Sequence, residues 1–487
     1  MSIPVLLGID LGTSSVKVSA LAANGSEVTN GTSSYAAGQV HASDSPPSLD
    51  GWWNSIRQAI YQALSMNRLA VQAIGLSGQM HGVVLVDSQG AGIYHPIIWN
   101  DTRAAPLLPE ADRYAKPYAD ELLNLQAPGF AAAILFWLAR ARPDLLNRAR
   151  WALQPKDWLG ARLTGAFCTE VSDASATGLW DFSKSAWHEG FCRMLSVDAA
   201  LLPPVLGCDR VRGALQHSAA HDLGLPPGIP VTMGRADTAA AQLGSSAPPV
   251  PGQSILILGT GGQFTQIIGS RPNFVPAGLM GLAGPLAGSY YLMAPIYAAG
   301  LSLNWLRALW SLDWGEFYDV AFSTAAATTN PLFTPFGLAA SGDRARPATA
   351  ALGDWHNLRL DHTQAHLIRA SLEGCLYALR QGRDLLLSHP QARQPADCAL
   401  VGGGARDDRV RQLVADIFGI PVKCPDLLNA SARGAALTAS VAAGWSGTTR
   451  DACTALARPV STYYPDPKAA EIHTTQFRQF KSFTGIR

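Results

Sequence analysis

Two similar units, each made of a strand, a glycine–threonine turn and a second strand, lie about half a chain apart in this sequence. Apolar and alternating segments predict the strands over residues 5–9 and 16–21 in the first unit and 254–258 and 263–268 in the second. The turns between them are Asp10–Ser15 and Gly259–Gly262. A chain of 487 residues is long enough for two large domains, so the repeat indicates a duplicated domain.

The stretch between the two units has the composition of a linker. Residues 244–252 read Gly-Ser-Ser-Ala-Pro-Pro-Val-Pro-Gly, and these residue types favour turns and loops. We therefore expect an N-terminal domain over residues 1–244 and a C-terminal domain over residues 245–487.

Helical and strand patterns alternate along both halves. Periodicity predicts helices over 52–66, 131–140, 362–387 and 407–418, and apolar runs predict strands over 73–76, 82–86, 229–233 and 399–401. Asp361 and Asp407 stand where helix N-caps are expected, whereas the segment from about Ala455 onward has no strong pattern. This alternation predicts an α/β fold.

The composition excludes several functional classes. Hydrophobic residues make up 48% and charged residues 15%, which is too apolar for a disordered chain. The formal net charge of +1 gives no global field that would attract nucleic acid or an acidic membrane. The longest apolar run, Phe130–Ala139, is far shorter than the about 20 residues that cross a bilayer. None of the cysteines forms a CxxC pair and the N-terminus lacks the basic region of a signal peptide, so we expect a soluble, cytoplasmic protein.

Both turns are candidates for a phosphate site. A tight glycine turn exposes backbone N–H groups, and a Thr or Ser hydroxyl adds a donor, so the turn can bind phosphate. Asp10 would repel a phosphate unless a cation lay between them, and it therefore suggests Mg²⁺. For one turn taken alone, an ordinary hairpin with Asp10 as a turn former is the alternative. A Walker A sequence is absent, because the chain contains no Gly-Lys pair.

Two further strands end in sequences that suit a binding site. The glycines of Gly402–Gly404, between a strand and a helix, let a flat ligand approach the backbone closely, although a plain strand-to-helix connection would look the same. Asp237 ends another strand just before the expected domain boundary. Its carboxylate is suited to act as a general base or to cap the helix that follows, and the two roles are compatible.

Two loops carry residue types that are common in carbohydrate sites. The loop Ser77–Gly82 contains Gln79 and His81, which can hydrogen-bond a sugar, although a single histidine is more often structural. The segment that begins at Trp99 adds an aromatic ring, an amide and an ion pair within five residues. Carbohydrate sites favour that mixture, but so do ordinary loops.

Taken together and in this order, these motifs resemble the FGGY family of carbohydrate kinases, most closely its xylulokinase branch. The resemblance covers about residues 3–445, and the Gln79–Gly82 loop resembles that branch rather than the glycerol kinases. The matching segments are Gly8–Ser14, Gly78–Gly82, Trp99–Asp101, Pro155–Leu159, Ser172–Ser175, Asp237 before Ala239–Ala240, Leu258–Gly261 and Gly402–Arg406.

The resemblance implies an actin/Hsp70-type fold, in which two ribonuclease-H-like α/β domains surround a central cleft. It also implies ATP in that cleft, with the phosphates at the two turns, the adenosine near the glycine run, and Asp10 serving Mg²⁺. The residues implied in nucleotide binding are Gly12, Thr13, Ser14, Gly259, Thr260, Gly261, Gly403, Gly404 and Ala405.

The resemblance further implies phosphorylation of D-xylulose to D-xylulose 5-phosphate. Asp237 would take the proton from the C5 hydroxyl as that oxygen attacks the γ-phosphate, and closure of the cleft would exclude water. The residues implied in sugar binding are Gln79, Met80, His81, Trp99, Asn100, Asp101 and Asp237. Family members often form dimers, so a homodimer is compatible with the resemblance.

Two positions depart from the family's pattern. Arg235 stands two residues before Asp237, where members commonly carry glycine. In extended backbone both side chains would share a face, and the guanidinium would lower the pKa of Asp237. The alternatives are that Arg235 faces the phosphates or points away from the cleft, and we expect Arg235→Gly to change kcat. The second departure, Ser341–Pro347, bears on the geometry near the cleft and on the substrate range.

Three other functions fit parts of the pattern. A kinase of the same fold could act on another ketose, a polyol or gluconate. A sugar- or ATP-binding protein without turnover is disfavoured by the presence of both Asp10 and Asp237. An ATP-driven conformational protein of the actin/Hsp70 type is disfavoured by the sugar-loop residues, because such an ATPase has no sugar to hold.

Overall fold

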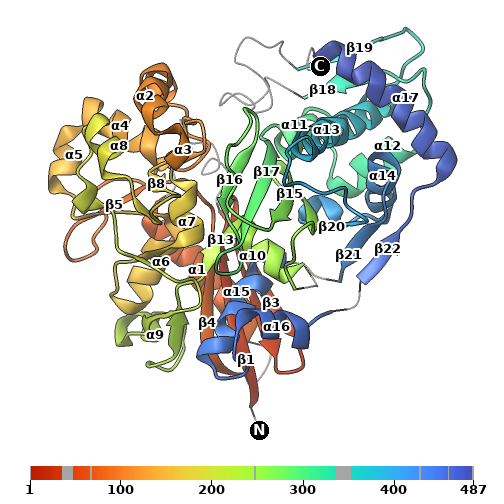
Figure 1. Ribbon diagram of the computed structural model, residues 1–487. Helices are drawn as coiled ribbons and strands as arrows, with labels where there is room; N and C mark the ends of the chain where they lie inside the picture. Colours follow the sequence, from red (N-terminus) through yellow and green to blue (C-terminus); the bar gives the residue numbers. More distant parts are fainter. Residues whose placement is uncertain are drawn as a thin grey trace.

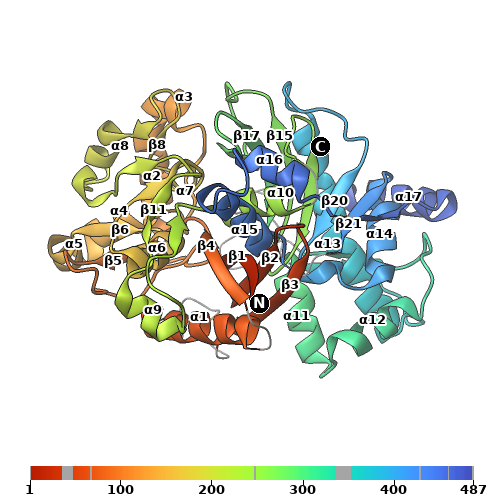
Figure 2. The ribbon, with the colours of Figure 1, turned by 90° about the horizontal axis from the view of Figure 1, so that it is seen from below.

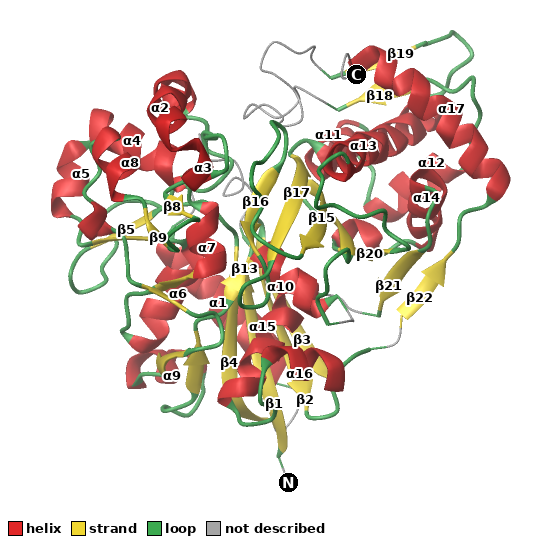
Figure 3. Ribbon diagram, in the orientation of Figure 1, coloured by secondary structure: helices red, strands yellow, loops and turns green. Residues whose placement is uncertain are grey.

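Two mixed β-sheets organise the molecule, one in each half of the chain, and helices pack around both (Figures 1 and 3). The computed structural model describes residues 2–35, 48–65, 69–245, 248–335, 353–426, 429–458 and 460–484. Strands and helices alternate along the described chain, which confirms the predicted α/β class.

The first sheet is built from the N-terminal half. Its strand order is β11-β12-β4-β1-β2-β3, and the short strand β13 also pairs with β4. The central strand β1 runs antiparallel to β2 and parallel to β4. The bounds are β1 (Ile3–Leu11), β2 (Ser15–Ala22), β3 (Glu27–Ser34), β4 (Leu69–Gly78), β11 (Val211–Ala214), β12 (Pro230–Thr232) and β13 (Arg235–Ala236).

The second sheet is built from the C-terminal half in the order β16-β17-β15-β14-β20-β21-β22. Its strand β14 runs antiparallel to β15 and parallel to β20, just as β1 pairs with β2 and β4. The repeat read from the sequence is therefore a repeat of sheet topology. The bounds are β14 (Ser254–Leu258), β15 (Gly262–Ile268), β16 (Met280–Ala283), β17 (Tyr290–Ile296), β20 (Cys398–Val401), β21 (Val422–Pro425) and β22 (Val460–Tyr463).

Short strand pairs decorate both halves. The expected strand over 82–86 is reduced to three residues, because only its last part pairs with another strand. These pairs are β5 (Val84–Val86) with β6 (Trp151–Leu153), β7 (Thr169–Glu170) with β10 (Val205–Leu206), β8 (Trp180–Asp181) with β9 (Ala186–Trp187), and β18 (Leu332–Thr334) with β19 (Asp354–His356).

Helices cover the sheets on both sides. Those of the N-terminal half are α1 (Leu49–Leu64), α2 (Leu108–Ala115), α3 (Ala119–Leu122), α4 (Ala131–Ala141), α5 (Pro143–Arg148), α6 (Pro155–Thr164), α7 (Val171–Ala176), α8 (Glu189–Met194), α9 (His217–Leu223) and α10 (Asp237–Gly244). Those of the C-terminal half are α11 (Ala299–Leu309), α12 (Trp314–Phe322), α13 (Gln364–Leu387), α14 (Asp408–Phe418), α15 (Ala430–Ala442), α16 (Thr449–Ala455) and α17 (Pro467–Thr484).

Helices α10 and α15 pack against each other between the sheets, and α15 also lies directly on β1 and β4 (Figures 1 and 2). This close approach requires glycine. A Cβ at Gly8 of β1 would collide with the carbonyl oxygen of Ala432, and one at Gly75 of β4 would collide with that of Ala435. Thus α15 belongs to the second half in sequence but covers the sheet of the first half. The domain boundary at residue 244 remains a prediction.

The helix ends show which caps the sequence identified. Asp407 caps α14 by accepting a hydrogen bond from the backbone N–H of Arg409, as expected. Asp361 was expected to cap α13, and that expectation is wrong. Thr363 is the N-cap and forms a reciprocal pair with His366, while the Asp361 carboxylate accepts hydrogen bonds from Arg359 instead.

The C-terminal segment, which has no strong pattern in sequence, docks as helix α17. Phe477 and Phe480 lie in the core of the second half, and both rings lie against Tyr377 of α13. No helix in the described ranges combines the length and the apolar character that crossing a membrane requires.

Candidate active site

A cavity of about 220 Å³ lies where the two halves meet, at the ends of β1 and β14. Both glycine–threonine turns open into it. Of the residues selected from the sequence, those that line it are Asp10, Gly12, Thr13, Ser14, Met80, His81, Trp99, Asp237, Gly259, Thr260, Gly261 and Gly403. Segments that are hundreds of residues apart in the chain therefore meet around one cavity.

Asp10 lies at the end of β1 and is 4% exposed. Ser77 of β4 donates a hydrogen bond to its Oδ1 at 2.9 Å, and Lys17 stands opposite Asp10 on β2. Burial raises the pKa of Asp10, while Lys17 and the Ser77 hydroxyl act to lower it. The carboxylate is thus held by the sheet and directed at the cavity, next to the first turn.

Asp237 is the first residue of α10 and keeps partial exposure to the cavity. Its Oδ1 accepts a hydrogen bond from the backbone N–H of Thr238 at 2.6 Å. Burial and then the negative charge of Asp10 raise the pKa of Asp237 to about 7. The capping interpretation is wrong, because the N-cap of α10 is Ala236 and no side chain caps this helix. Asp237 lines the cavity, and its role as a general base stays a prediction.

The second turn and the glycine run depend on close backbone approaches. Gly259 donates its N–H to the carbonyl of Gly261 at 2.9 Å, which closes the turn. Gly402 has a φ of 103°, and a Cβ there would collide with the carbonyl of Leu258. A short 3₁₀ segment, Gly403–Ala405, follows before α14 begins. Gly403 lines the cavity, whereas Gly404 and Ala405 are not among its lining residues.

Two candidate sugar-site residues that line the cavity, His81 and Trp99, are each held by a side-chain hydrogen bond. His81 adopts a φ of 75°, donates from Nδ1 to the carbonyl of Ala176 at 2.5 Å, and stacks on Phe130. Trp99 donates from Nε1 to the hydroxyl of Thr13 at 2.8 Å. Trp99 therefore links the segment that it begins to the first glycine–threonine turn.

Three other sugar-site candidates are not among the residues that line the cavity. Gln79 donates to the carbonyl of Gly12 at 3.3 Å and so supports the first turn from behind. Asp101 is 4% exposed and forms an ion pair with Arg103 at 2.8 Å. Asn100, between that pair and Trp99, is also absent from the lining.

Arg235 points away from the cavity. Its guanidinium donates to the carbonyl of Pro285, to the hydroxyl of Thr438 and to the carboxylate of Asp209. It therefore joins the first sheet to elements of the second half, and the alternative that Arg235 points away from the cleft is confirmed. The alternative of a lowered Asp237 pKa is wrong, because that pKa is raised. The effect of Arg235→Gly on kcat remains a prediction. The other departure, Ser341–Pro347, lies outside the described residues.

Several lining residues escaped the sequence reading. Lys17 could have been found, since pairing the two hairpin strands places it opposite Asp10. Met280, Met293 and Tyr297 come from β16, β17 and the loop after them, and nothing local marks them. The ring centroids of Tyr297 and Trp99 lie 5.6 Å apart, so Tyr297 of the second half packs beside Trp99 of the first half.

Comparison with known proteins agrees with this geometry. The model for the FGGY family of carbohydrate kinases, N-terminal domain, matches residues 5–244, and that for the C-terminal domain matches residues 255–443. The xylulose kinase of Escherichia coli (strain K12) is 30% identical over 416 residues, with 85% of this chain and 84% of the relative covered.

Solved structures show the same architecture. The xylulose kinase from Rhodospirillum rubrum superposes with a TM-score of 0.81 at 25% identity and covers 99% of this chain and 98% of its own. Gluconate kinase from Lactobacillus acidophilus superposes at 0.85 with 21% identity, covering 99% and 98%, which shows a common fold. The predicted two-domain fold is confirmed, and the chain belongs to the FGGY family of carbohydrate kinases.

Proposed function

We propose that this carbohydrate kinase transfers the γ-phosphoryl group of ATP to the C5 hydroxyl of D-xylulose, with Asp237 as the general base. The observation that carries the proposal is that two carboxylates, Asp10 and Asp237, share one 220 Å³ cavity with both glycine–threonine turns. Curated relatives that cover most of the chain are xylulose kinases, and they support the choice of sugar.

The two turns are suited to hold the phosphates of ATP. Thr13 and Thr260 supply hydroxyl donors at the cavity, while the N–H groups of Gly12 and Gly259 form hydrogen bonds within the two turns and hold their shape. Phosphoryl transfer requires little covalent work from the protein, so correct placement and charge neutralisation supply most of the rate enhancement. The bond between the γ-phosphorus and the bridging oxygen breaks as the sugar oxygen forms its own bond to phosphorus.

Asp237 is suited to accept the proton of the attacking hydroxyl. A general base is most effective when its pKa lies near the working pH, and burial together with Asp10 brings the pKa of Asp237 to about 7. The proton moves to an Asp237 oxygen as the sugar oxygen attacks, so the activity should fall as the pH drops below 7.

The residues at Asp10 also fit Mg²⁺ delivered with the nucleotide. Within the described ranges, no group of three or more His, Cys, Asp or Glu side chains is placed to hold a metal alone. Magnesium commonly takes one or two carboxylates, phosphate oxygens and waters, and Asp10 beside the first turn matches that donor set. Asp10 would hold the ion, which neutralises phosphate charge when bound.

The sugar would lie against the side of the cavity that His81 and Trp99 line. His81 lines this side of the cavity, and the hydrogen bond from its Nδ1 to the carbonyl of Ala176 holds the orientation of its ring. A site that bonds individual hydroxyls discriminates strongly between sugars of different hydroxyl orientation. The assignment of D-xylulose therefore requires a direct test.

The test is coupled ADP release against D-xylulose, other ketoses, polyols and gluconate, with Asp237→Asn alongside. Loss of a general base typically lowers the rate by about 10²–10⁴-fold. Asp384→Asn is the control, because Asp384 pairs with Arg383 on α13 and does not line the cavity. The 5-deoxy analogue of D-xylulose should be inert, while the 1-deoxy analogue, which keeps the C5 hydroxyl, should react.

Each outcome decides a different part of the proposal. Turnover of D-xylulose that collapses only in Asp237→Asn supports both the sugar and the base. Turnover of another acceptor, again lost in the variant, replaces the sugar and keeps the base. ADP release that ignores every acceptor contradicts the proposed reaction.

A further inference from the structure

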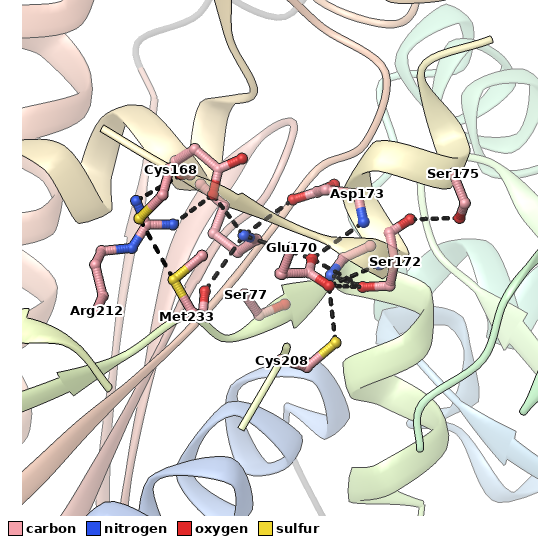
Figure 4. A network of polar contacts seen from close by, with 12 residues as sticks. Ser77, Cys168, Glu170, Ser172, Asp173, Ser175, Cys208, Arg212 and Met233 are labelled. Carbon is pink, nitrogen blue, oxygen red and sulfur yellow. Dashed lines mark hydrogen bonds and ion pairs between the residues drawn. The ribbon is translucent and has the colours of Figure 1, made fainter. Parts of the chain in front are cut away.

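A cluster of five ionisable side chains lies buried behind Asp237, outside the cavity lining. Lys156 of α6 forms ion pairs with Asp157 at 2.7 Å, with Asp173 at 3.2 Å and with Glu170 at 3.6 Å. Arg212 closes the cluster by pairing with Asp157 at 2.6 Å. All five side chains have an exposed fraction of 0% in these pairs. Figure 4 shows Glu170, Ser172 and Asp173 gathered at one end of this network and Arg212 at the other.

The cluster contains three acids and two bases. Burial, together with the negative charges of Glu170 and Asp157, raises the pKa of Asp173 well above its ordinary value, while Lys156 acts to lower it. Burying charged groups costs free energy even when they are paired. We therefore looked for a part of the chain that this cluster holds in place.

The cluster holds the short segment that leads into Asp237. Lys156 donates from Nζ to the carbonyl of Met233 at 3.3 Å, at the start of that segment. Ser172 of α7 accepts a hydrogen bond from the N–H of Ala236 at 3.0 Å, at its end. Gly234 between them has a φ of 79°, and a Cβ there would collide with the carbonyl of Leu76. One end of the segment is therefore anchored to the cluster itself and the other end to Ser172, beside the cluster, while its middle is packed against β4.

The orientation of the Ser172 hydroxyl follows from its other partner. Ser172 Oγ lies 2.9 and 2.8 Å from the two carboxylate oxygens of Glu170. A carboxylate only accepts, so the serine is the donor in this pair. A hydroxyl has one proton, so the lone pairs of Ser172 are left for the Ala236 amide. Glu170 is in turn fixed by Lys156 and by the N–H groups of Ser172 and Asp173 at the start of α7.

We propose that Ser172 is a positioning residue for phosphoryl transfer, because its hydroxyl, oriented by Glu170, holds the Ala236 amide and thereby fixes Asp237 in the cavity. The inference rests on the proposed role of Asp237 as general base. Ser172 touches neither substrate. It acts by keeping the backbone immediately before the base in one place, and a small displacement of a reacting group lowers a rate by up to about 10²-fold.

The test compares Ser172→Ala with Ser175→Ala. Both serines are buried on α7, and both accept a hydrogen bond from a backbone N–H, that of Ala236 for Ser172 and that of Ala283 on β16 for Ser175. The two variants thus remove matched hydrogen bonds, but only one of these bonds leads to Asp237. We expect Ser172→Ala to lower kcat by about 10–100-fold with less than a twofold change in either KM. Ser175→Ala should keep kcat within about twofold of the parent, which a purely structural role for both serines would not produce.

Two additional variants keep the inference open to refutation. Ser172→Thr retains the hydroxyl and should restore most of kcat. If Ser172→Ala does not fold, Glu170→Gln is measured instead, since it weakens the orientation of the hydroxyl and should lower kcat without raising KM. Equal kcat values for Ser172→Ala and Ser175→Ala, or a loss that appears in KM alone, would overturn the inference. The measurement uses any acceptor on which the parent is active, so a wrong sugar assignment does not affect it, whereas an active Asp237→Asn variant would remove its basis.

Discussion

The two halves carry the same turn on the same strand pairing, yet the residues at equivalent register positions differ in charge. In the first sheet Asp10 lies opposite Lys17 on one neighbouring strand and Ser77 on the other. In the second sheet the matching position is Ile257, which lies opposite Gln263 and Val401. All of these residues except Ser77 line the cavity. One half therefore presents charged groups and the other mainly apolar and neutral ones.

The difference indicates a division of labour within a duplicated architecture. Asp10 and Asp237 already face the same cavity, and the charge of Asp10 helps to raise the pKa of Asp237. A third carboxylate at position 257 would raise these pKa values further and repel the phosphates. An apolar surface at Ile257 and Val401 instead suits the flat, uncharged part of a nucleotide. We therefore expect the second half to contribute mainly to nucleotide binding and the first half to supply the acid for the chemical step.

The largest expected effect comes from making the first half resemble the second in charge. Asp10→Asn should lower kcat by about 10²–10³-fold. Among the described residues of the first turn, Asp10 carries the only carboxylate that lines the cavity, and the variant removes it. The matched change on the other side, Ile257→Val, should leave kcat within about threefold. Steady-state kinetics at saturating ATP and Mg²⁺ checks both variants. Equal losses would mean that the two halves contribute alike to the chemical step.

A smaller effect should separate the two threonines. Thr13→Val removes a hydroxyl that also accepts a hydrogen bond from Trp99 Nε1. The variant therefore disturbs the segment at Trp99 as well as the first glycine–threonine turn. We expect kcat/KM to fall roughly 10–100-fold, the range for a lost hydrogen bond to a charged group. Thr260→Val should act mainly on KM for ATP, and Thr13→Ser, which keeps the hydroxyl, is the control. A Thr260→Val variant with the larger loss in kcat would reverse the assignment of roles.

Much of the sheet framework could be predicted from the sequence, whereas the helix that joins the halves could not. The strands of both repeats are apolar or alternating, and these patterns are local. Helix α15 consists mostly of small residues that are buried on nearly all sides, including Ala432, Ala435 and Gly434. It therefore lacks the amphipathic period on which helix prediction depends. Its position depends on glycines in the strands that it contacts, such as Gly8 and Gly75. In the sequence these glycines indicate that some segment packs closely on the strands, but not which segment.

The candidate site shows the same limit. Turn residues such as Thr13 and Thr260 can be identified from the sequence, because a tight glycine turn is determined by neighbouring residues. Met280 and Met293 line the cavity only because two strands of the second sheet meet the first half there, which no local pattern encodes. The direction of Arg235 is also a tertiary property, since its three partners come from elements far apart in the chain.

The smallest expected effect is on thermal stability. It tests whether the ionised carboxylate of Asp237 in the first half destabilises the folded protein. The pKa of Asp237 is raised from an ordinary value near 4 to about 7, so the folded state favours the protonated form. Ionised Asp237 therefore destabilises the fold fully above pH 7, partly between pH 4 and 7, and not at all below pH 4. Asp237→Asn removes this penalty and should raise Tm at pH 8 by a few degrees, with a smaller gain at pH 5. Thermal unfolding of parent and variant without ligands measures the difference. No equivalent gain is expected from Ile257→Val, because no ionisable group is buried at that position in the second half. A Tm gain for Asp237→Asn that was equal at both pH values would show that packing, and not the charge of Asp237, separates the variant from the parent.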